Sequence, residues 1–592
     1  MMPEDPQVFA AEGQEPPPLI VEHLVPESPP LRSTLPVRRS RFRLCTHNPF
    51  YVTSAALVVY GLFVSFPVEK TAGMVPLLAV SLASYVLLLG GTAWILRRLG
   101  VLWEDLRMLG LLVVLLLPMV SVGLDALLQA RPEIGRFWSF GGALLALVVG
   151  EALLYGLRVR LPVGYRLPYH LLMTLFFLYP AFVQARAIDP HDPTLQWLLF
   201  GFTTAAAAIL LMLLPAVWRG PAYVSQNGTP WSWPWYPLTI FVPLVLCVAG
   251  RAYYLCEAFH AVDVGESIFG WYFLSPLLFV IAGLFLIGTR HASGAFARRM
   301  GLALPAVAVL TTSVDLSPGC DFAAREFLGH FRGAIGTLPP LAVLCCATAF
   351  YGVASILRVR RAFLCFSGAI VAAAFVGPDS ASLFDRTVPT NPWPLLVAGA
   401  LLYGRALLRG EVAKGLLGAL CWGLFVVLWS SRYPAAPALF FGYHLVVVLL
   451  VLLARRTVGD WRTLLTGLAA LMILFAGIEH SVHGWRGLFA QLPATAFDWY
   501  LPAVFLFTTA SSYWLRDTWL LAVSIAMLLG ATGRYGVRSY HWLKFYVAGL
   551  DAIAAGLALF VAAVGVSLGK RRRPPPIPNV VPASAERLDR PS

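Results

Sequence analysis

One segment combines two histidines and a carboxylate at helical spacing. It reads Glu479-His480-Ser-Val-His483, so Glu479 and His483 are four residues apart and the two histidines three apart. On a helix, residues at these spacings share a face. Two imidazoles and a carboxylate on one face can bind a divalent transition metal. We therefore predict a metal site formed by Glu479, His480 and His483.

Two other segments pair a glutamate with a histidine. Glu257 and His260 are three residues apart, and Glu326 and His330 are four apart. Such pairs could contribute ligands to the same metal, or act as general acid and base in glycosyl or phosphoryl transfer. The His-Glu-x-x-His order of zinc proteases is absent, so the spacing alone does not specify the chemistry. These four residues are the candidate catalytic residues.

Two of the eight cysteines, Cys256 and Cys320, lie near these segments. The chain has no Cys-x-x-Cys pair. If both thiols faced an oxidising compartment, they could form a disulfide. We predict a Cys256–Cys320 disulfide on that basis.

The elements that must position these residues are transmembrane helices. Hydrophobic residues make up 58% of the 592 residues and charged residues 12%, with a mean hydropathy of +0.73. A water-soluble domain could not bury that much apolar surface, so lipid is the solvent for most of the chain. The sequence predicts an all-α, polytopic transmembrane helix bundle.

A helix needs about 20 mostly apolar residues to cross a bilayer. Windows of that length predict eighteen spans, or sixteen if two short windows do not cross. The first nine are 49–67, 73–96, 108–129, 137–157, 168–185, 194–217, 235–251, 268–289 and 299–315. The other nine are 337–357, 361–377, 392–408, 413–430, 434–454, 462–478, 498–515, 517–533 and 544–568.

The charges at the span ends predict the orientation. Arg and Lys flanking a span stay preferentially on the cytoplasmic side, and alternate loops of this chain are basic from Arg38 to the run Lys570–Arg573. Both termini are then cytoplasmic. The prevalence of Arg over Lys favours a bacterial plasma (inner) membrane. In this orientation the three His-bearing segments lie on the outer face, where the alternative role of their side chains is to anchor helix ends at the interface.

Three regions follow from this assignment. Residues 1–44 form a disordered cytoplasmic tail with a basic flank, 45–569 form the transmembrane domain, and 570–592 form a disordered, basic and Pro-rich tail. The net charge of +14 is mostly an orientation signal. No basic soluble domain is predicted, which excludes nucleic acid as a partner. Membrane lipids and a solute or lipid substrate are the expected partners.

Two ionisable residues fall inside predicted spans, Glu151 in the fourth and His444 in the fourteenth. Such residues are costly in lipid and normally face the bundle interior. A buried acid and a buried imidazole could change protonation during transport, or they could hold neighbouring helices together.

Three interpretations of function remain open. The first is a transporter or flippase of a small or lipidic solute, with proton coupling through Glu151 and His444. The second is a membrane-embedded enzyme whose outer-face histidines and carboxylates bind substrate or a divalent metal. The third is a scaffold or sensor subunit of a membrane complex. Many-helix proteins without soluble domains are most often transporters, which favours the first.

Overall fold

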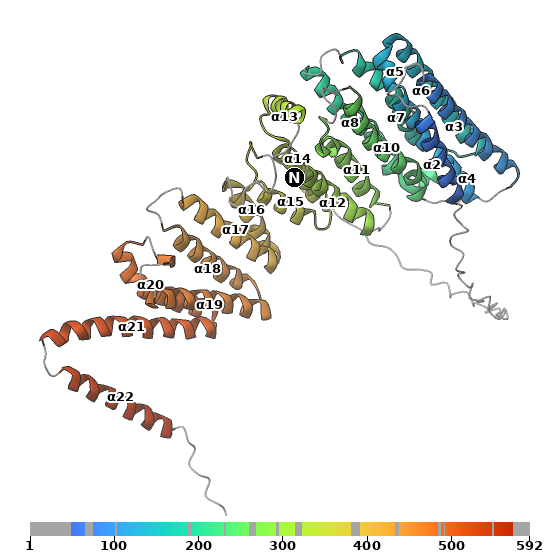
Figure 1. The fold of residues 1–592 in the computed structure, drawn as a ribbon. Coiled ribbons are helices and arrows are strands. Elements are labelled where there is room, and N and C mark those ends of the chain that lie inside the picture. Colours follow the sequence, from blue (N-terminus) through green and yellow to red (C-terminus); the bar gives the residue numbers. More distant parts are fainter. Residues whose placement is uncertain are drawn as a thin grey trace, which may run out of the picture.

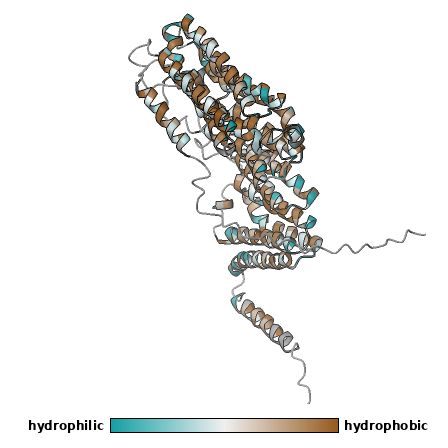
Figure 2. Ribbon diagram, turned by 90° about the vertical axis from the view of Figure 1, so that its right-hand side faces the viewer, coloured by the Kyte–Doolittle hydropathy of each residue, from teal (hydrophilic) through white to brown (hydrophobic). Residues whose placement is uncertain are grey.

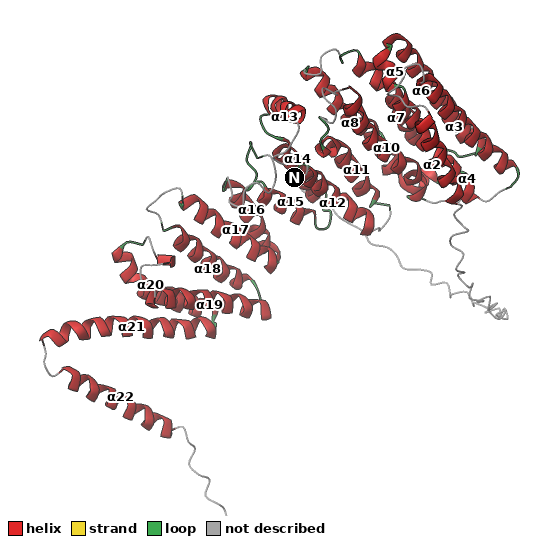
Figure 3. Cartoon of the chain, viewed as in Figure 1, coloured by secondary structure: helices red, strands yellow, loops and turns green. Residues whose placement is uncertain are grey.

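The computed structural model describes residues 49–65, 75–100, 103–187, 192–229, 233–259, 268–291, 295–313, 322–380, 391–431, 437–482, 487–489, 492–546 and 550–571. These residues form helices and connecting turns without a β-strand among them (Figure 3). The all-α prediction is therefore confirmed. The predicted tails lie outside the described residues, apart from Lys570 and Arg571 at the end of the last helix.

The helices follow one another along the chain with short connections. The N-terminal ones are α2 (Pro49–Ser65), α3 (Val75–Arg98), α4 (Trp103–Gly123), α5 (Asp125–Ala130), α6 (Pro132–Gly156), α7 (Val163–Gln184), α8 (Pro193–Leu211), α9 (Leu214–Arg219), η2 (Gly220–Val224), α10 (Trp235–Phe259), η3 (Trp271–Leu274) and α11 (Ser275–Gly288). The central ones are α12 (Ala295–Thr311), α13 (Phe322–Ile335), α14 (Pro339–Ile356) and α15 (Ala362–Ala372). The C-terminal ones are α16 (Trp393–Arg409), α17 (Val412–Ser430), α18 (Ala438–Arg456), α19 (Asp460–Val482), η4 (Gly487–Phe489), α20 (Ala494–Leu515), α21 (Thr518–Tyr546) and α22 (Leu550–Arg571).

Most of the helices have the length and composition of membrane spans. Each of the eighteen predicted ranges overlaps a helix. Twelve helical segments among the described residues are long and apolar enough to cross a bilayer by themselves. Large apolar side chains stay exposed on their outer surfaces, and the apolar colouring runs along most of the helices (Figure 2). An exposed apolar exterior is what a lipid-facing bundle requires, so this is a multi-pass membrane protein.

The core is divided between an N-terminal and a C-terminal region, with a smaller cluster between them. The N-terminal cluster joins α2–α8, α10, η3 and α13, and the C-terminal cluster joins α16–α21. The central cluster joins α12, α14 and α15. The N-terminal, central and C-terminal regions follow one another in space as they do in the sequence, and α22 extends away from the rest beyond α21 (Figure 1). Within the N-terminal bundle, α4 packs against α3, α6, α7 and α10, which makes it the central helix.

Helix α13 was not predicted, because its sequence lies in what we interpreted as an outer loop. Its apolar side chains Phe327 and Phe331 are buried, whereas Arg325 is exposed. The buried pair packs against Trp197 of α8 and Tyr272 of η3. The two buried phenylalanines are four residues apart and share one face of the helix, and the opposite face carries charge. This pattern is typical of an amphipathic helix that lies on a bundle rather than crosses the bilayer.

Candidate functional site

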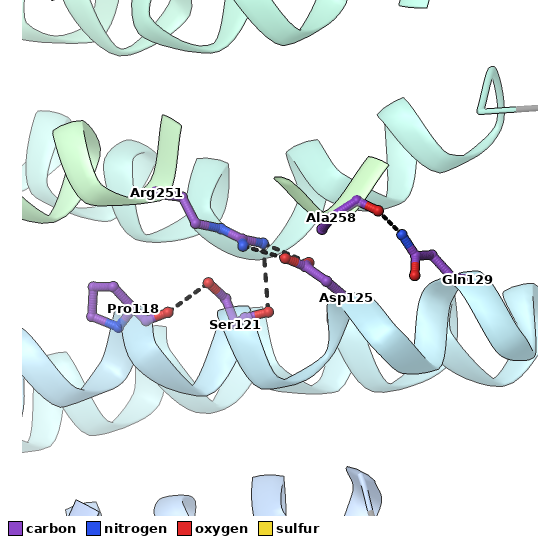
Figure 4. A network of polar contacts seen from close by, with 6 residues as sticks. All are labelled: Pro118, Ser121, Asp125, Gln129, Arg251 and Ala258. Carbon is purple, nitrogen blue, oxygen red and sulfur yellow. Dashed lines mark hydrogen bonds and ion pairs between the residues drawn. The ribbon is translucent and has the colours of Figure 1, made fainter. Parts of the chain in front are cut away.

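An ion pair between Asp125 and Arg251 is enclosed in the N-terminal bundle (Figure 4). Asp125 is the first residue of α5, directly after the interruption that separates α5 from α4, and Arg251 lies on α10. The guanidinium donates one hydrogen bond from Nη2 to Oδ1 at 2.7 Å and a second from Nη1 to Oδ2. The two side chains are only 1% and 5% exposed. Two parallel bonds fix both orientations and neutralise charges that would be costly in this surrounding.

The residues around this ion pair tie α4 and α5 to α10. The Ser121 hydroxyl donates to the Pro118 carbonyl at 2.6 Å, and Arg251 Nη2 also reaches the Ser121 carbonyl at 3.5 Å. One turn further, the Gln129 amide donates to the Ala258 carbonyl (Figure 4). Pro118 has no N–H, so it removes one bond from the helix ladder. Three buried residues, Ser121, Asp125 and Arg251, therefore lie next to the turn at Leu124 where α4 ends and α5 begins.

This ion pair was not predicted from the sequence. The seventh predicted span ends at residue 251, whereas α10 continues to Phe259, so Arg251 lies inside the helix rather than at its end. Asp125 and Arg251 are 126 residues apart. The available signal was that two opposite charges lie near the outer ends of the predicted spans 108–129 and 235–251, and that the predicted orientation puts both ends on the same side.

Glu151 has two partners on the next helix. Arg166 of α7 donates from Nε to Oε1 at 2.6 Å and from Nη2 to Oε2, and His170 Nε2 contacts Oε1. The Glu151 side chain is 37% exposed and Arg166 is 49% exposed. The carboxylate is therefore half-buried and paired, not isolated in the bundle. Its role in proton coupling stays a prediction.

His444 of α18 has both ring nitrogens engaged. Nδ1 donates to the Phe440 carbonyl one turn earlier at 2.8 Å, and Nε2 accepts from the Tyr500 hydroxyl of α20 at 3.0 Å. This arrangement corresponds to the neutral imidazole, because one nitrogen donates and the other accepts. The Phe440 and Tyr500 rings lie 4.2 and 5.5 Å from the imidazole, centroid to centroid. His444 therefore links α18 to α20, and its predicted protonation change is not tested.

Glu326 and His330 come together through Gln196. Gln196, at the start of α8, is fully buried. Its Nε2 donates to Glu326 Oε2 at 3.4 Å, and His330 Nδ1 donates to its Oε1 at 2.8 Å. The structure therefore gathers one predicted pair into a polar cluster beneath α13. In the other pair, Glu257 is half-buried near the end of α10 and His260 lies outside the described residues.

His480 is enclosed at the end of α19. It is 1% exposed and stacks on Phe497 at 4.2 Å between centroids. Nε2 lies 2.9 Å from the Phe497 carbonyl, and Nδ1 lies 3.0 Å from Nη1 of Arg534 on α21. Arg534 is 3.9 Å from Asp498 of α20. Both imidazole nitrogens thus have protein partners.

The predicted metal site and disulfide each include a residue outside the described part of the chain. Glu479 is half-buried beside His480, but His483 is not described. Among the described residues, no group of three His, Cys, Asp or Glu side chains is close enough to hold a metal ion. Cys256 is buried with a free thiol, and Cys320 is not described. Both the metal and the disulfide stay predictions.

Comparison with protein-family models, with curated proteins and with solved structures finds no match to this chain.

Proposed function

We propose that this protein moves a small or lipidic solute across the membrane, along a pathway beside the Asp125–Arg251 pair. The α4–α5 segment carries Asp125 of that pair and is the most enclosed of the candidate spans. In its apolar window 72% of the residues are buried, against 28–44% for the other eleven. Ionisable groups kept inside a membrane bundle usually mark a substrate or ion pathway. This ion pair is the observation that carries the proposal.

The turn between α4 and α5 supports the same proposal. Transporter sites are typically built where a transmembrane helix is discontinuous, because the freed backbone groups and helix ends can face a solute. Here the helix is tightened rather than broken: Leu124 keeps helical φ/ψ values, and its N–H donates to the Ser121 carbonyl at 3.2 Å. This turn lies between Ser121 and Asp125, both of which contact Arg251. A change of partner by Arg251 would alter the contacts of α4, α5 and α10 together. That coupling gives the bundle a means to alternate between two arrangements.

Proton coupling, in this proposal, uses Glu151 and His444. Glu151 faces Arg166 and His170, so protonation of the carboxylate would weaken its bond to α7. His444 would gain a second donor on protonation and lose the Tyr500 hydroxyl as a donor to Nε2. Each change would act on a contact between two helices.

The proposed orientation places both termini in the cytoplasm of a bacterial cell, with the chain in the plasma membrane. The support is the alternation of basic loops along the sequence. Two contacts are consistent with this assignment: Gln129 donates to the Ala258 carbonyl, and Arg160 N donates to the Asn227 carbonyl. Each contact joins residues that the assignment places on one side. A reporter fused after residue 592 that fluoresces only in the cytoplasm tests the side of the C-terminus.

The transport proposal can be tested without knowledge of the solute, by measuring whether position 121 is accessible to water from both sides of the membrane. In a variant without its eight cysteines, Ser121→Cys is treated with a membrane-impermeant thiol reagent in right-side-out and in inside-out vesicles. We expect slow labelling from both sides, because the pathway would open to each in turn. Ser139→Cys on α6 is the matched control, since Ser139 is 1% exposed and Ser121 2% exposed. We expect no labelling of the control.

Labelling of Ser121→Cys from neither side, or from one side only, would contradict the pathway. Labelling of both variants alike would show general loosening of the bundle and would also count against the proposal. Asp125→Asn in the same background should lock the bundle in one state and restrict labelling to one side.

A second candidate function, a membrane-embedded enzyme, is favoured by the cluster of Gln196, Glu326 and His330. A histidine and a carboxylate held by one buried amide could act as acid and base at the outer face. Lipids extracted from cells with the wild-type protein would then contain a product that is missing from cells with the His330→Ala variant.

A metal is tested by native mass spectrometry of the wild-type protein and of the His480→Ala/His483→Ala variant. A stoichiometric ion that the variant loses would favour the enzyme, and the absence of an ion from both proteins would count against a metal enzyme.

A further inference from the structure

An apolar crevice of about 80 Å³ lies in the N-terminal bundle between α4, α6 and α10. It is at the end of the bundle opposite to Asp125, where the 157–162 and 220–229 connections meet. Its walls are mainly leucines: Leu106 and Leu111 of α4, and Leu153, Leu154 and Leu157 at the end of α6. Leu111 and Leu154 are partly exposed, so the crevice is open on one side.

Arginines surround this crevice. Arg107 is part of its lining. Arg97 at the end of α3 lies near enough to Arg158 for the two charges to interact, and Arg160 lines a polar hollow that adjoins the crevice at Leu161. Arg97, Arg107, Arg158 and Arg160 thus lie at this end of the bundle, whereas Arg166 is paired with Glu151. An anionic group is therefore favoured at the mouth of the crevice.

The size of the crevice limits what can enter it. A cavity of roughly 150 Å³ holds a benzene molecule, so 80 Å³ has room for a few methylene groups. An open, apolar crevice of that size suits a segment of one acyl chain rather than a whole lipid or a polar solute. Because lipid tails are as apolar as leucine, the chain alone would give little preference. The charge of the headgroup must supply the selectivity.

We propose that the crevice binds the first part of one acyl chain of an anionic phospholipid, with the phosphate of that lipid beside Arg107. The lipid comes from the leaflet at this end of the bundle. The site does not depend on the proposed transport function, since it involves neither Asp125 nor Arg251. The bound lipid would join α4, α6 and α10 at the end of the bundle opposite to the Asp125–Arg251 pair.

Native mass spectrometry of the full chain tests this site. The protein is delipidated in a mild detergent and supplied with phosphatidylglycerol or phosphatidylcholine. We expect one tightly retained phosphatidylglycerol per chain and no retained phosphatidylcholine. Arg107→Gln should weaken retention by roughly fivefold, which is the scale of one arginine at an anionic lipid surface. Its matched control is Arg98→Gln, because Arg98 is exposed and stacks on Trp94 at 4.0 Å.

A filling variant tests the apolar part separately. A Cβ added at Gly110 would lie 3.7 Å from Leu157 Cδ1, an ordinary contact, so the longer side chain of Gly110→Leu would enter the crevice. We expect this variant to lose the lipid. Gly91→Leu on α3 is the control, because Gly91 is exposed and a Cβ there meets no atom within 4 Å. If Gly110→Leu does not fold, Arg107→Gln decides alone.

Equal retention of the two lipids, or equal losses in the test and control variants, would overturn the proposal, because the retained lipid would then be unspecific. The labelling of Ser121→Cys is a separate measurement. Its failure would remove the transport pathway and leave the lipid site intact, and the reverse also holds.

Discussion

The N-terminal and C-terminal regions each hold an arginine inside a polar cluster, but they satisfy it in different ways. Arg251 pairs with a carboxylate that is also enclosed, so two full charges depend on each other. Arg534 meets the imidazole of His480 at 3.0 Å and lies 4.8 Å from the Phe497 ring centroid, and its carboxylate neighbour Asp498 is 42% exposed. One strong interaction therefore stabilises the arginine of the first cluster, whereas several weak interactions together stabilise the arginine of the second.

This difference predicts how each region responds to a substitution. Removal of one partner of an enclosed ion pair leaves an uncompensated charge, which costs more than the pair itself contributes. Removal of one member of a distributed cluster leaves the other contacts in place. The substitutions below test this contrast, in order of decreasing effect on stability.

Asp125→Asn should have the largest effect, about 3–5 kcal/mol of destabilisation, because the Arg251 guanidinium stays buried without its counter-charge. Thermal unfolding in detergent measures it. The matched double variant Asp125→Leu/Arg251→Met removes both charges and should unfold within about 1 kcal/mol of wild type. A double variant as unstable as the single one would show that the geometry of the pair, and not its charge, holds α5 to α10.

His480→Ala should cost about 2 kcal/mol, since it removes the stacking on Phe497 and the bond to the Phe497 carbonyl. The neighbouring Ser481→Ala is the control: its hydroxyl bonds only one turn back, to the Gly477 carbonyl at 2.8 Å, on an exposed face. We expect little change from it in the same unfolding measurement. A loss from His480→Ala as large as that from Asp125→Asn would contradict the contrast between the two regions.

The helices could be predicted from the sequence because lipid imposes one strong requirement on each span. A run of about 20 apolar residues has to close its own backbone hydrogen bonds and expose apolar side chains. Each range predicted by this local rule overlaps a helix, and twelve helical segments of the described residues are long and apolar enough to cross a bilayer. The rule failed where charge falls inside a helix, as at Arg251, and where a helix does not cross the bilayer, as in α13. The four-residue spacing of Phe327 and Phe331 indicates the amphipathic helix α13. A hydropathy average over a span-length window does not detect it, because the window also includes the charged residues of the opposite face.

The partners of the polar residues could not be predicted. Asp125 and Arg251 are 126 residues apart and His480 and Arg534 are 54 apart, and nothing local in the sequence indicates which helices lie side by side. Spacing did place Glu326 and His330 on one face, as the structure has them. Gln196, which joins the two, is a neutral amide 134 residues before His330 and carries no motif.

Arg534→Gln and Arg538→Gln form a matched pair within the C-terminal cluster. Both arginines lie near Asp498, at 3.9 and 3.7 Å. Arg534 also contacts His480 and Phe497, whereas the Arg538 side chain is 74% exposed. We expect about 1 kcal/mol of destabilisation from Arg534→Gln and a few tenths from Arg538→Gln, because exposed ion pairs contribute little. Equal losses in thermal unfolding would assign the stability to Asp498 rather than to the ring contacts.

Tyr500→Phe should have a smaller effect than Arg534→Gln, about 0.6 kcal/mol, which is typical of one hydrogen bond between transmembrane helices. It removes only the hydroxyl that donates to His444 Nε2, and the ring keeps its contacts with His444 and Phe440. Tyr513→Phe on the same helix is the control, because Tyr513 is 88% exposed. If Tyr500→Phe lowers the free energy of unfolding by more than about 2 kcal/mol, the single hydrogen bond between His444 and Tyr500 stabilises the region as strongly as an enclosed pair such as Asp125–Arg251. A loss near the expected value means that the rings, more than the hydrogen bond, hold His444 between α18 and α20. The imidazole would then be able to change its protonation without unfolding the region, as the proposed proton coupling requires.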